Sequence, residues 1–449
     1  MRRKHCWIGG IGILALLAVL PVISSGAPSA NKGSKAPAAT EKLLYSFTGG
    51  TDGANPMSGL VLDSAGNLYG TTSNGGTVRL CGGGGCGTVF ELKRTQNGWQ
   101  EQVLHSFQGG NDGASPQAGL IFDAAGNLYG TTRLAGTSGL GTVFKLAPNG
   151  KGGWTESTLY SFGAGANPAS DLVFDTNGNM YGTTLSGGIA SCFLGTGCGT
   201  VFELIKQSDG SWTGSTIYEF TGPPNDGEIP SSGVTIDSSG NLYGTTVAGG
   251  SGQCDLAYNP GCGVAYKLTP DGKGNWTETV LFNFARGNGF AVIPSSGLLV
   301  DQAGDRLVGT TLHGGDGVGT VFVLKQSKDL LWKQDVLHRF YESQDGFYPV
   351  GQLTKDGNGN LFGVTWAGGG VTNQGFGNGM VFELEPSTMG VWKETIVYAF
   401  AGGTDAWDPQ AGVALDNLGH LYGTTLRGGT GTLCSQAVYG CGTVYEITP

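Results

Sequence analysis

Eight cysteines in four close pairs are the residues of this sequence with the most distinctive chemistry. Four to seven residues separate the two members of a pair, and each pair lies just before a Gly-Thr or Gly-Val step. A zinc site needs four ligands, and no histidine accompanies any pair. A phosphate-binding loop needs a Lys-Ser or Lys-Thr and a following helix, which are also missing. Local disulfides are therefore predicted, as in exported proteins. The pairs are Cys81 and Cys86, Cys192 and Cys198, Cys254 and Cys262, and Cys434 and Cys441.

Acidic loops form a second group of candidates. Five loops of similar composition, such as "GGTDGANP" (49–56) and "GGNDGASP" (109–116), carry an aspartate. On one face of a protein these carboxylates would form a ring able to bind a cation or a basic ligand. A simpler interpretation is that each aspartate caps its own turn. The five residues are Asp52, Asp112, Asp226, Asp345 and Asp405.

A third group consists of aromatic and charged loop residues that have no counterpart in most comparable loops. Aromatic side chains beside a few polar groups on one face are able to stack on a sugar ring or anchor a peptide. The alternative is ordinary loop variation without a binding role. The candidates are Trp366, Trp407, Tyr348, Arg133, Arg427 and His313, with Arg286 and Asp316 nearby.

These loops connect the parts of a repeat that recurs along the chain. The segment "GLVLDSAGNLYGTT" (59–72) returns as "GLIFDAAGNLYGTT" (119–132) and in five further versions. The glycine of the "YGTT" step, or of the equivalent step in the other copies, falls at positions 70, 130, 182, 244, 309, 363 and 423. The period is therefore ~59 residues over seven copies.

Each copy has the composition of four short strands. In the first copy these are residues 58–63, 68–73, 87–94 and 99–107, rich in Val, Leu, Thr and aromatics and bounded by Gly, Asn and Asp. Seven sets of four antiparallel strands predict an all-β, seven-bladed β-propeller. An open solenoid is the alternative, but ~59 residues is too long for one coil of a β-helix.

The two ends of the repeat region indicate how the ring closes. The last copy stops after "GTVYEITP" (442–449), without a fourth strand. The segment "EKLLYSF" (41–47) matches fourth strands such as "QVLHSF" (102–107). We therefore expect the N-terminal strand to complete the seventh blade, which would remove two open sheet edges. The predicted propeller spans residues 41–449.

The unit "GNLYGTT" followed by "GTVF" resembles the Gly-rich GloVer tandem repeat, which is named for Gloeobacter and Verrucomicrobia. The resemblance covers nearly all of residues 41–449 and recurs seven times. Members of this choice-of-anchor family carry varied C-terminal surface anchors, and this chain is expected to lack one. The resemblance implies secretion and a propeller-like repeat, and it implies no reaction.

Side chains that recur at one position of every copy are expected to be structural. The aspartate that begins the first turn of each copy, for example Asp63, should accept backbone N–H groups, because calcium needs six to eight oxygens. Trp99 and its equivalents at the start of the fourth strand, and Tyr69 and its equivalents, should pack between strands. His105 and His338 replace a recurrent tyrosine and should pack likewise.

The N-terminus has the layout of an export signal. Basic residues 2–4 precede an apolar run, Trp7–Ile23, and small residues follow it, which predicts a signal peptide of residues 1–26. An uncleaved anchor is the alternative. Residues 27–40 are predicted to be a flexible linker. The net charge of −10 argues against nucleic-acid and anionic-membrane partners.

These features favour a secreted or periplasmic monomer that binds a polysaccharide, cell-surface material or a protein through one loop face. The alternatives are a propeller enzyme, such as a lyase, lactonase or glycoside hydrolase, and a structural envelope protein. Enzymes need paired acid and base groups in one place, and no such pair departs from the repeat. No catalytic residue and no cofactor is predicted, and calcium is the one ion the acidic loops would suit.

Overall fold

The computed structural model describes residues 39–78, 81–163, 166–188, 192, 195–256, 259–286, 291–314, 318–341, 345–370, 377–387, 390–434 and 439–449. The predicted signal peptide, most of the predicted linker and the candidate Asp316 lie outside these ranges. Within the described part of the chain, no helix is long and apolar enough to span a membrane.

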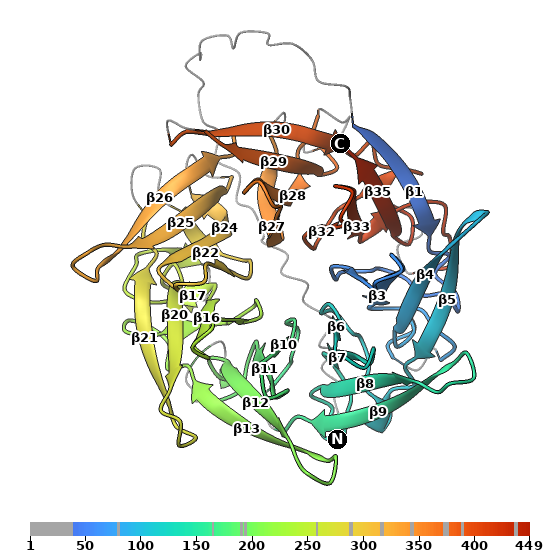
Figure 1. The fold of residues 1–449 in the computed structure, drawn as a ribbon, viewed down its shortest axis with the longest axis horizontal. Helices are drawn as coiled ribbons and strands as arrows, with labels where there is room; N and C mark the ends of the chain where they lie inside the picture. Colours follow the sequence, from blue (N-terminus) through green and yellow to red (C-terminus); the bar gives the residue numbers. More distant parts are fainter. Residues whose placement is uncertain are drawn as a thin grey trace, which may run out of the picture. The chain divides into compact units, whose positions relative to one another are not determined.

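Seven antiparallel sheets of four principal strands follow one another around a ring, so the predicted seven-bladed propeller is confirmed (Figure 1). In blade 1 the strands are β2 Val61–Leu62, β3 Leu68–Thr72, β4 Thr88–Thr95 and β5 Gly98–Ser106. Blade 2 has β6 Ile121–Phe122, β7 Leu128–Thr132, β8 Thr142–Pro148 and β9 Trp154–Ser161. Blade 3 has β10 Val173–Phe174, β11 Met180–Thr184, β12 Thr200–Lys206 and β13 Trp212–Glu219.

The remaining blades repeat this order with small additions. Blade 4 has β15 Thr235–Ile236, β16 Leu242–Thr245, β20 Val264–Pro270 and β21 Trp276–Asn283. Blade 5 has β23 Leu299–Val300, β24 Arg306–Gly314, β25 Thr320–Gln326 and β26 Trp332–Arg339, with β22 Ala291–Pro294 added beside β24. Blade 6 has β27 Phe347–Lys355, β28 Leu361–Ala367, β29 Met380–Pro386 and β30 Trp392–Ala399. Blade 7 has β32 Ala414–Leu415, β33 Leu421–Thr425, β35 Thr443–Thr448 and β1 Thr40–Ser46.

The first strand of blade 1 is shorter than the sequence predicted. Only Val61 and Leu62 pair with β3, although residues 58–63 were expected to be extended. The chain reaches this strand through Asn55, which has a φ of 57°, and Pro56, which has no N–H to donate. This pair of residues does not end a ladder by itself, because Tyr348 and Pro349 stand within β27 of blade 6. In blade 1 the Ser58 hydroxyl, and not a backbone carbonyl, accepts the Thr71 N–H at 3.4 Å, so backbone pairing begins only further along.

Each residue of the recurrent Gly-Thr-Thr motif has its own structural role. A Cβ on Gly70 would lie 2.7 Å from the Phe90 ring, so only glycine leaves room for that ring. The Thr71 hydroxyl donates to the carbonyl of Ala118 in the next blade at 3.1 Å. The Thr72 hydroxyl lies 2.8 Å from that of Thr88 within the blade. The motif therefore fixes the interior of a blade and its contact with the next.

The aspartate of each first turn caps that turn, as predicted. The Asp63 carboxylate accepts the N–H groups of Ala65 and Asn67, both at 2.9 Å, and the Tyr69 hydroxyl at 3.1 Å. The Tyr69 ring lies edge-on to Trp154 of the next blade, with 6.2 Å between centroids. The recurrent tyrosine and tryptophan thus pack across a blade boundary, which confirms their structural role.

The ring closes through the N-terminal strand, as predicted. Strand β1 runs antiparallel to β35, with Thr40 opposite Thr448 and Ser46 opposite Thr443 (Figure 1). Phe47, which directly follows β1, is completely buried and contacts the Phe90 ring of blade 1 edge-on, at 5.1 Å. One short segment therefore completes blade 7 and packs against blade 1.

All four predicted disulfides are present, linking Cys81–Cys86, Cys192–Cys198, Cys254–Cys262 and Cys434–Cys441. Each closes the loop between the second and third strands of its blade. The first bond packs on the loop that leads into the next blade, because a Cβ on Gly109 would lie 3.2 Å from the Cys81 sulfur. The disulfides hold glycine-rich loops in place beside the neighbouring blade.

Replacing Cys81 and Cys86 together by serine is expected to lower the free energy of unfolding by about 2 kcal/mol, because the bond closes a very short loop. Denaturant unfolding of the oxidised protein measures this loss. A strong reductant should remove the difference between the variant and the parent. A difference that persists under reduction would mean that the serines, and not the missing bond, cause it.

Candidate binding site on blades 6 and 7

One residue of each blade has a left-handed backbone on the face that carries the strand 4–1 and strand 2–3 loops, here called the loop face. It precedes a proline, and its φ is between 56° and 68° in all seven copies. In blade 7 the N–H of this residue, Asp408, donates to the Asn378 carbonyl at 3.0 Å, and its own carbonyl accepts the Leu426 N–H at 2.9 Å. Equivalent backbone bonds are present where the residue is asparagine, serine or isoleucine, so the conformation does not depend on one type of side chain. These seven pinned residues are Asn55, Ser115, Asn167, Ile229, Ile293, Tyr348 and Asp408.

In blade 6 the pinned residue is a tyrosine that joins an aromatic group. The Tyr348 ring lies 5.8 Å from the Trp366 ring in a tilted arrangement and 5.4 Å from the His313 ring, edge-on. Trp366 is on β28 and His313 on β24, so two blades contribute. All three side chains are partly exposed. The structure thus brings together three of the residues that the sequence singled out.

In blade 7 an arginine lies between two aromatic rings. Trp407 pairs with Arg427 between two short strands, β31 Ala406–Trp407 and β34 Arg427–Gly428. The Arg427 guanidinium lies 5.5 Å from the centre of the Trp407 ring and 5.3 Å from that of Tyr439. Such contacts orient a guanidinium while leaving its edge available to another acceptor.

Asp408 joins the two groups of aromatic residues. Its Oδ2 atom lies 3.6 Å from the Arg427 Nε, and its side chain also accepts hydrogen bonds from Gln410 and from the Trp366 indole. Burial raises the pKa of Asp408 to about 6, and the nearby Arg427 opposes that rise. We call Tyr348, Trp366, Trp407, Asp408 and Arg427 the blade 6–7 cluster.

The sequence had indicated four of these five residues and missed Asp408. Its signal was present, because an aspartate stands before the proline in "TDAWDP" where five other copies have asparagine, serine or isoleucine. Arg133 lies apart from the cluster, in blade 2. Its Nη1 donates to the Gln117 side chain at 3.2 Å, and burial lowers the pKa of its guanidinium.

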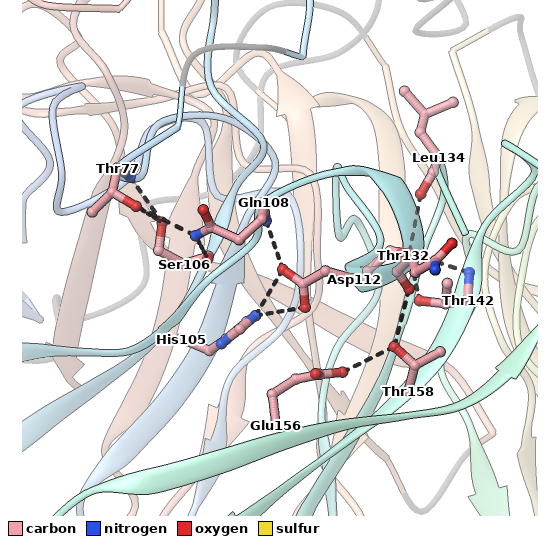
Figure 2. A network of polar contacts seen from close by, with 11 residues as sticks. Thr77, His105, Ser106, Gln108, Asp112, Thr132, Leu134, Thr142, Glu156 and Thr158 are labelled. Carbon is pink, nitrogen blue, oxygen red and sulfur yellow. Dashed lines mark hydrogen bonds and ion pairs between the residues drawn. The ribbon is translucent and has the colours of Figure 1, made fainter. Parts of the chain in front are cut away.

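The five loop aspartates each lie at a different blade boundary, so the structure does not bring them to one point. Asp112 shows the arrangement (Figure 2): its carboxylate accepts the Gln108 N–H at 2.6 Å and lies 3.0 Å from the His105 Nε2. Glu156, from the fourth strand of the next blade, faces the same carboxylate. Ligand atoms of His105, Asp112 and Glu156 lie within 4.8 Å of one another, and this trio has the donors to hold a metal ion.

The same acid pair recurs at four further boundaries. In each pair burial and the facing aspartate raise the pKa of the glutamate to about 7. Two carboxyls that face one another in a half-buried place share a proton more readily than they bear two charges. We call these the acid pairs. They are Asp52 with Glu101, Asp112 with Glu156, Asp226 with Glu278, Asp345 with Glu394, and Asp405 with Glu41.

The glutamates of these pairs were not among the residues predicted from the sequence, although the chain itself contains a sign of the pairing. Two copies lack the loop aspartate, in the segments 163–168 and 285–294. The fourth strands that follow have Gly214 and Gln334 where the others have glutamate. Aspartate and glutamate are therefore lost together, as expected of contacting residues.

Comparison with solved structures returns proteins at low identity. Periplasmic gluconolactonase of Pseudomonas aeruginosa is 15% identical over 76% of this chain and 84% of its own, with a TM-score of 0.46. A putative oxidoreductase (glucose dehydrogenase) of Thermus thermophilus is 14% identical over 91% of this chain and 100% of its own, with a TM-score of 0.43. A luciferin-regenerating enzyme is 18% identical over 74% and 90%, with a TM-score of 0.38. At these values nothing about activity follows.

Sequence comparison gives the family. The search of curated proteins returned no match. The family model described as the Gloeobacter/Verrucomicrobia repeat matches residues 32–254 and 194–435, which together span most of the blades. The chain therefore belongs to the Gloeobacter/Verrucomicrobia repeat family.

Proposed function

We propose that this protein is an exported binding propeller that recognises a polysaccharide through the blade 6–7 cluster. The observation that carries the proposal is that the aromatic and charged departures from the repeat are neighbours, although they come from separate segments of the chain. Tyr348, Trp366 and Trp407 are partly exposed on the loop face. Ordinary loop variation gives no reason for such clustering.

The composition of the cluster suits a sugar ligand. Partly exposed tryptophan and tyrosine rings offer flat apolar faces on which the C–H side of a sugar ring stacks. Arg427, whose side chain is 28% exposed, supplies a donor for hydroxyl groups, and the buried Asp408 holds it in place. Because these groups are ordered before ligand binds, little conformational entropy is lost on binding.

Export is part of the same proposal. The four disulfides support it, because such bonds persist in oxidising compartments. The export signal expected from residues 1–26 is consistent with them. Outside the cell or in the periplasm the cluster would meet polysaccharides of the envelope or the surroundings.

A thermal-shift and calorimetric screen of residues 27–449 against soluble neutral glycans tests the function. One glycan is expected to raise the melting temperature, and Trp366→Ala or Trp407→Ala should weaken its binding about tenfold, equivalent to about 1.4 kcal/mol. Arg133→Ala is the matched control, since Arg133 departs from the repeat but lies outside the cluster. A glycan that binds all three variants equally well would contradict the assignment. A screen without any shift would favour a protein ligand instead.

A further inference from the structure

Blade 5 differs from the other blades on the side that faces blade 6. Strand β24 has Val308 where six blades have tyrosine or phenylalanine, and Arg306 where five have asparagine and one has histidine. Val308 pairs with Val323 of β25, which takes the place of a glutamate or lysine in the other blades. One boundary therefore lacks the large aromatic ring and its charged neighbour.

The missing ring leaves a cavity between blades 5 and 6. At four other boundaries the tyrosine lies edge-on to a tryptophan of an adjoining blade, with centroids 5.6 to 6.2 Å apart. Here Val308 and Trp392 line an open cleft of about 940 Å³. Its volume is at the upper end of the usual range for small-molecule sites, which is about 300–1,000 Å³.

The cleft is basic although the chain carries a net charge of −10. Four cationic residues line it, Arg306, Lys325, Arg339 and Lys355, against two acidic residues, Asp301 and Asp335. Lys325 and Asp335 are bound to each other at 2.8 Å. Within the described part of the chain, the side chains of Arg306, Arg339 and Lys355 have no hydrogen bond or ion pair, and the Arg339 Nε is buried.

We propose that this cleft binds an acidic sugar, a short oligosaccharide of uronic acid type, as a second site independent of the blade 6–7 cluster. The guanidinium of an arginine is able to donate two parallel hydrogen bonds to one carboxylate. The cleft offers unpaired basic side chains for such a carboxylate. The Trp392 ring, which has no tyrosine against it, offers a surface for the sugar ring. Arg306 and Val308 both depart from the repeat on one strand, which makes the cleft a single-copy feature of blade 5.

Titration calorimetry of residues 27–449 with trigalacturonate tests the proposal. Binding is expected at low salt, and Arg306→Ala and Arg339→Ala should each weaken it about tenfold or more. Maltotriose, which has the same size without charge, should not compete. Inorganic phosphate is the control that shows whether an anion without a sugar ring also binds. Phosphate that binds as tightly as trigalacturonate would overturn the assignment of a sugar.

A substitution that restores the repeat gives a sharper test. Val308→Tyr places the ring of the other blades in the cleft, where its hydroxyl is able to reach Asp301 and its face Trp392. This variant should melt at the same temperature as the parent or higher, and trigalacturonate binding should be lost. Trp407→Ala should leave that binding unchanged, which separates this site from the proposed function. Full binding in Val308→Tyr, or no binding by the parent protein, would overturn the proposal.

Discussion

Deleting residues 40–47 is expected to abolish the cooperative thermal transition of the propeller. The deletion removes β1 from blade 7 and leaves β35 as an unpaired edge. It also removes Phe47, which is completely buried against Phe90. Burial of one large apolar side chain contributes about 1.5–3 kcal/mol, and Leu44 and Tyr45 pack in the same core. The loss therefore approaches the whole stability of an ordinary domain, about 5–15 kcal/mol.

Near-UV circular dichroism and a thermal melt measure this effect. Deleting residues 1–38 instead should leave the transition in place. A circular permutant should also fold, with residue 449 joined to residue 40 by a short Gly-Ser linker and new termini between the exposed residues Gly150 and Lys151. It is the matched control because it keeps β1 beside β35. A melt of the deleted chain within a few degrees of the parent would show that closure by β1 is dispensable.

The second large effect is a loss of stability as pH rises from about 5 to 8. The pKa of the glutamate in each acid pair is raised to about 7 in the folded protein, above the ordinary 4.5. Between these values the folded chain holds protons that the unfolded chain has released, so the free energy of unfolding falls as pH increases. Because the carboxyls are only half-buried, solvent screening reduces each contribution to about 1 kcal/mol. Five pairs together should lower the melting temperature by on the order of 5 °C.

Three of the acid pairs allow the carboxyl titration to be isolated. Glu101, Glu278 and Glu41 face aspartates bonded to tyrosine, whereas Glu156 and Glu394 lie near His105 and His338. Replacing the first three by glutamine should remove more than half of the fall in melting temperature between pH 5 and pH 8. Glu385→Gln alters an exposed ion pair with Lys393 and should leave the slope unchanged. Equal slopes in the triple variant and the parent would contradict the assignment.

A decline on the acid side is expected as well. Hydrogen bonds within the turns hold the pKa values of Asp123, Asp237 and Asp416 below the ordinary value, although burial opposes them. A carboxylate with a depressed folded pKa stabilises the fold above its unfolded pKa and loses that contribution as pH falls. We therefore expect the stability maximum near pH 4.5–5.

The fold was predictable because the same pattern of four short strands and turns recurs in every blade. The repeat predicted the number of blades, the match of 41–47 to other fourth strands predicted the closure, and the paired cysteines predicted the disulfides. Tyr69 and Trp99 were also correctly interpreted as packing residues. One short apolar segment alone does not identify a strand. Seven copies of the same segment do, which is why strands of only a few residues were predicted.

The contacts between blades were harder to predict. Asp112 was interpreted as a turn cap or a rim carboxylate, and only the lateral register of two sheets shows that Glu156 faces it. The grouping of Tyr348 with Trp366 and Asp408 depends on the same register. The replacement of the recurrent tyrosine by Val308 is visible in the sequence. The sequence does not show which tryptophan lacks a packed tyrosine ring as a result. Lateral packing is set by three-dimensional geometry and leaves no fixed spacing along the chain.

The pinned residues have a consequence for how this family diversifies. The same main-chain hydrogen bonds hold this conformation in Asn55, Ile229 and Asp408, so it does not depend on one type of side chain. Some of these side chains add a contact of their own, such as the bond from the Asn55 amide to the Leu426 carbonyl at 3.1 Å. Selection is therefore able to change the five pinned residues that are partly exposed while the blades remain intact: Asn55, Ser115, Asn167, Ile229 and Tyr348. A library randomised at these five positions should contain mostly folded members, each with its own ligand preference.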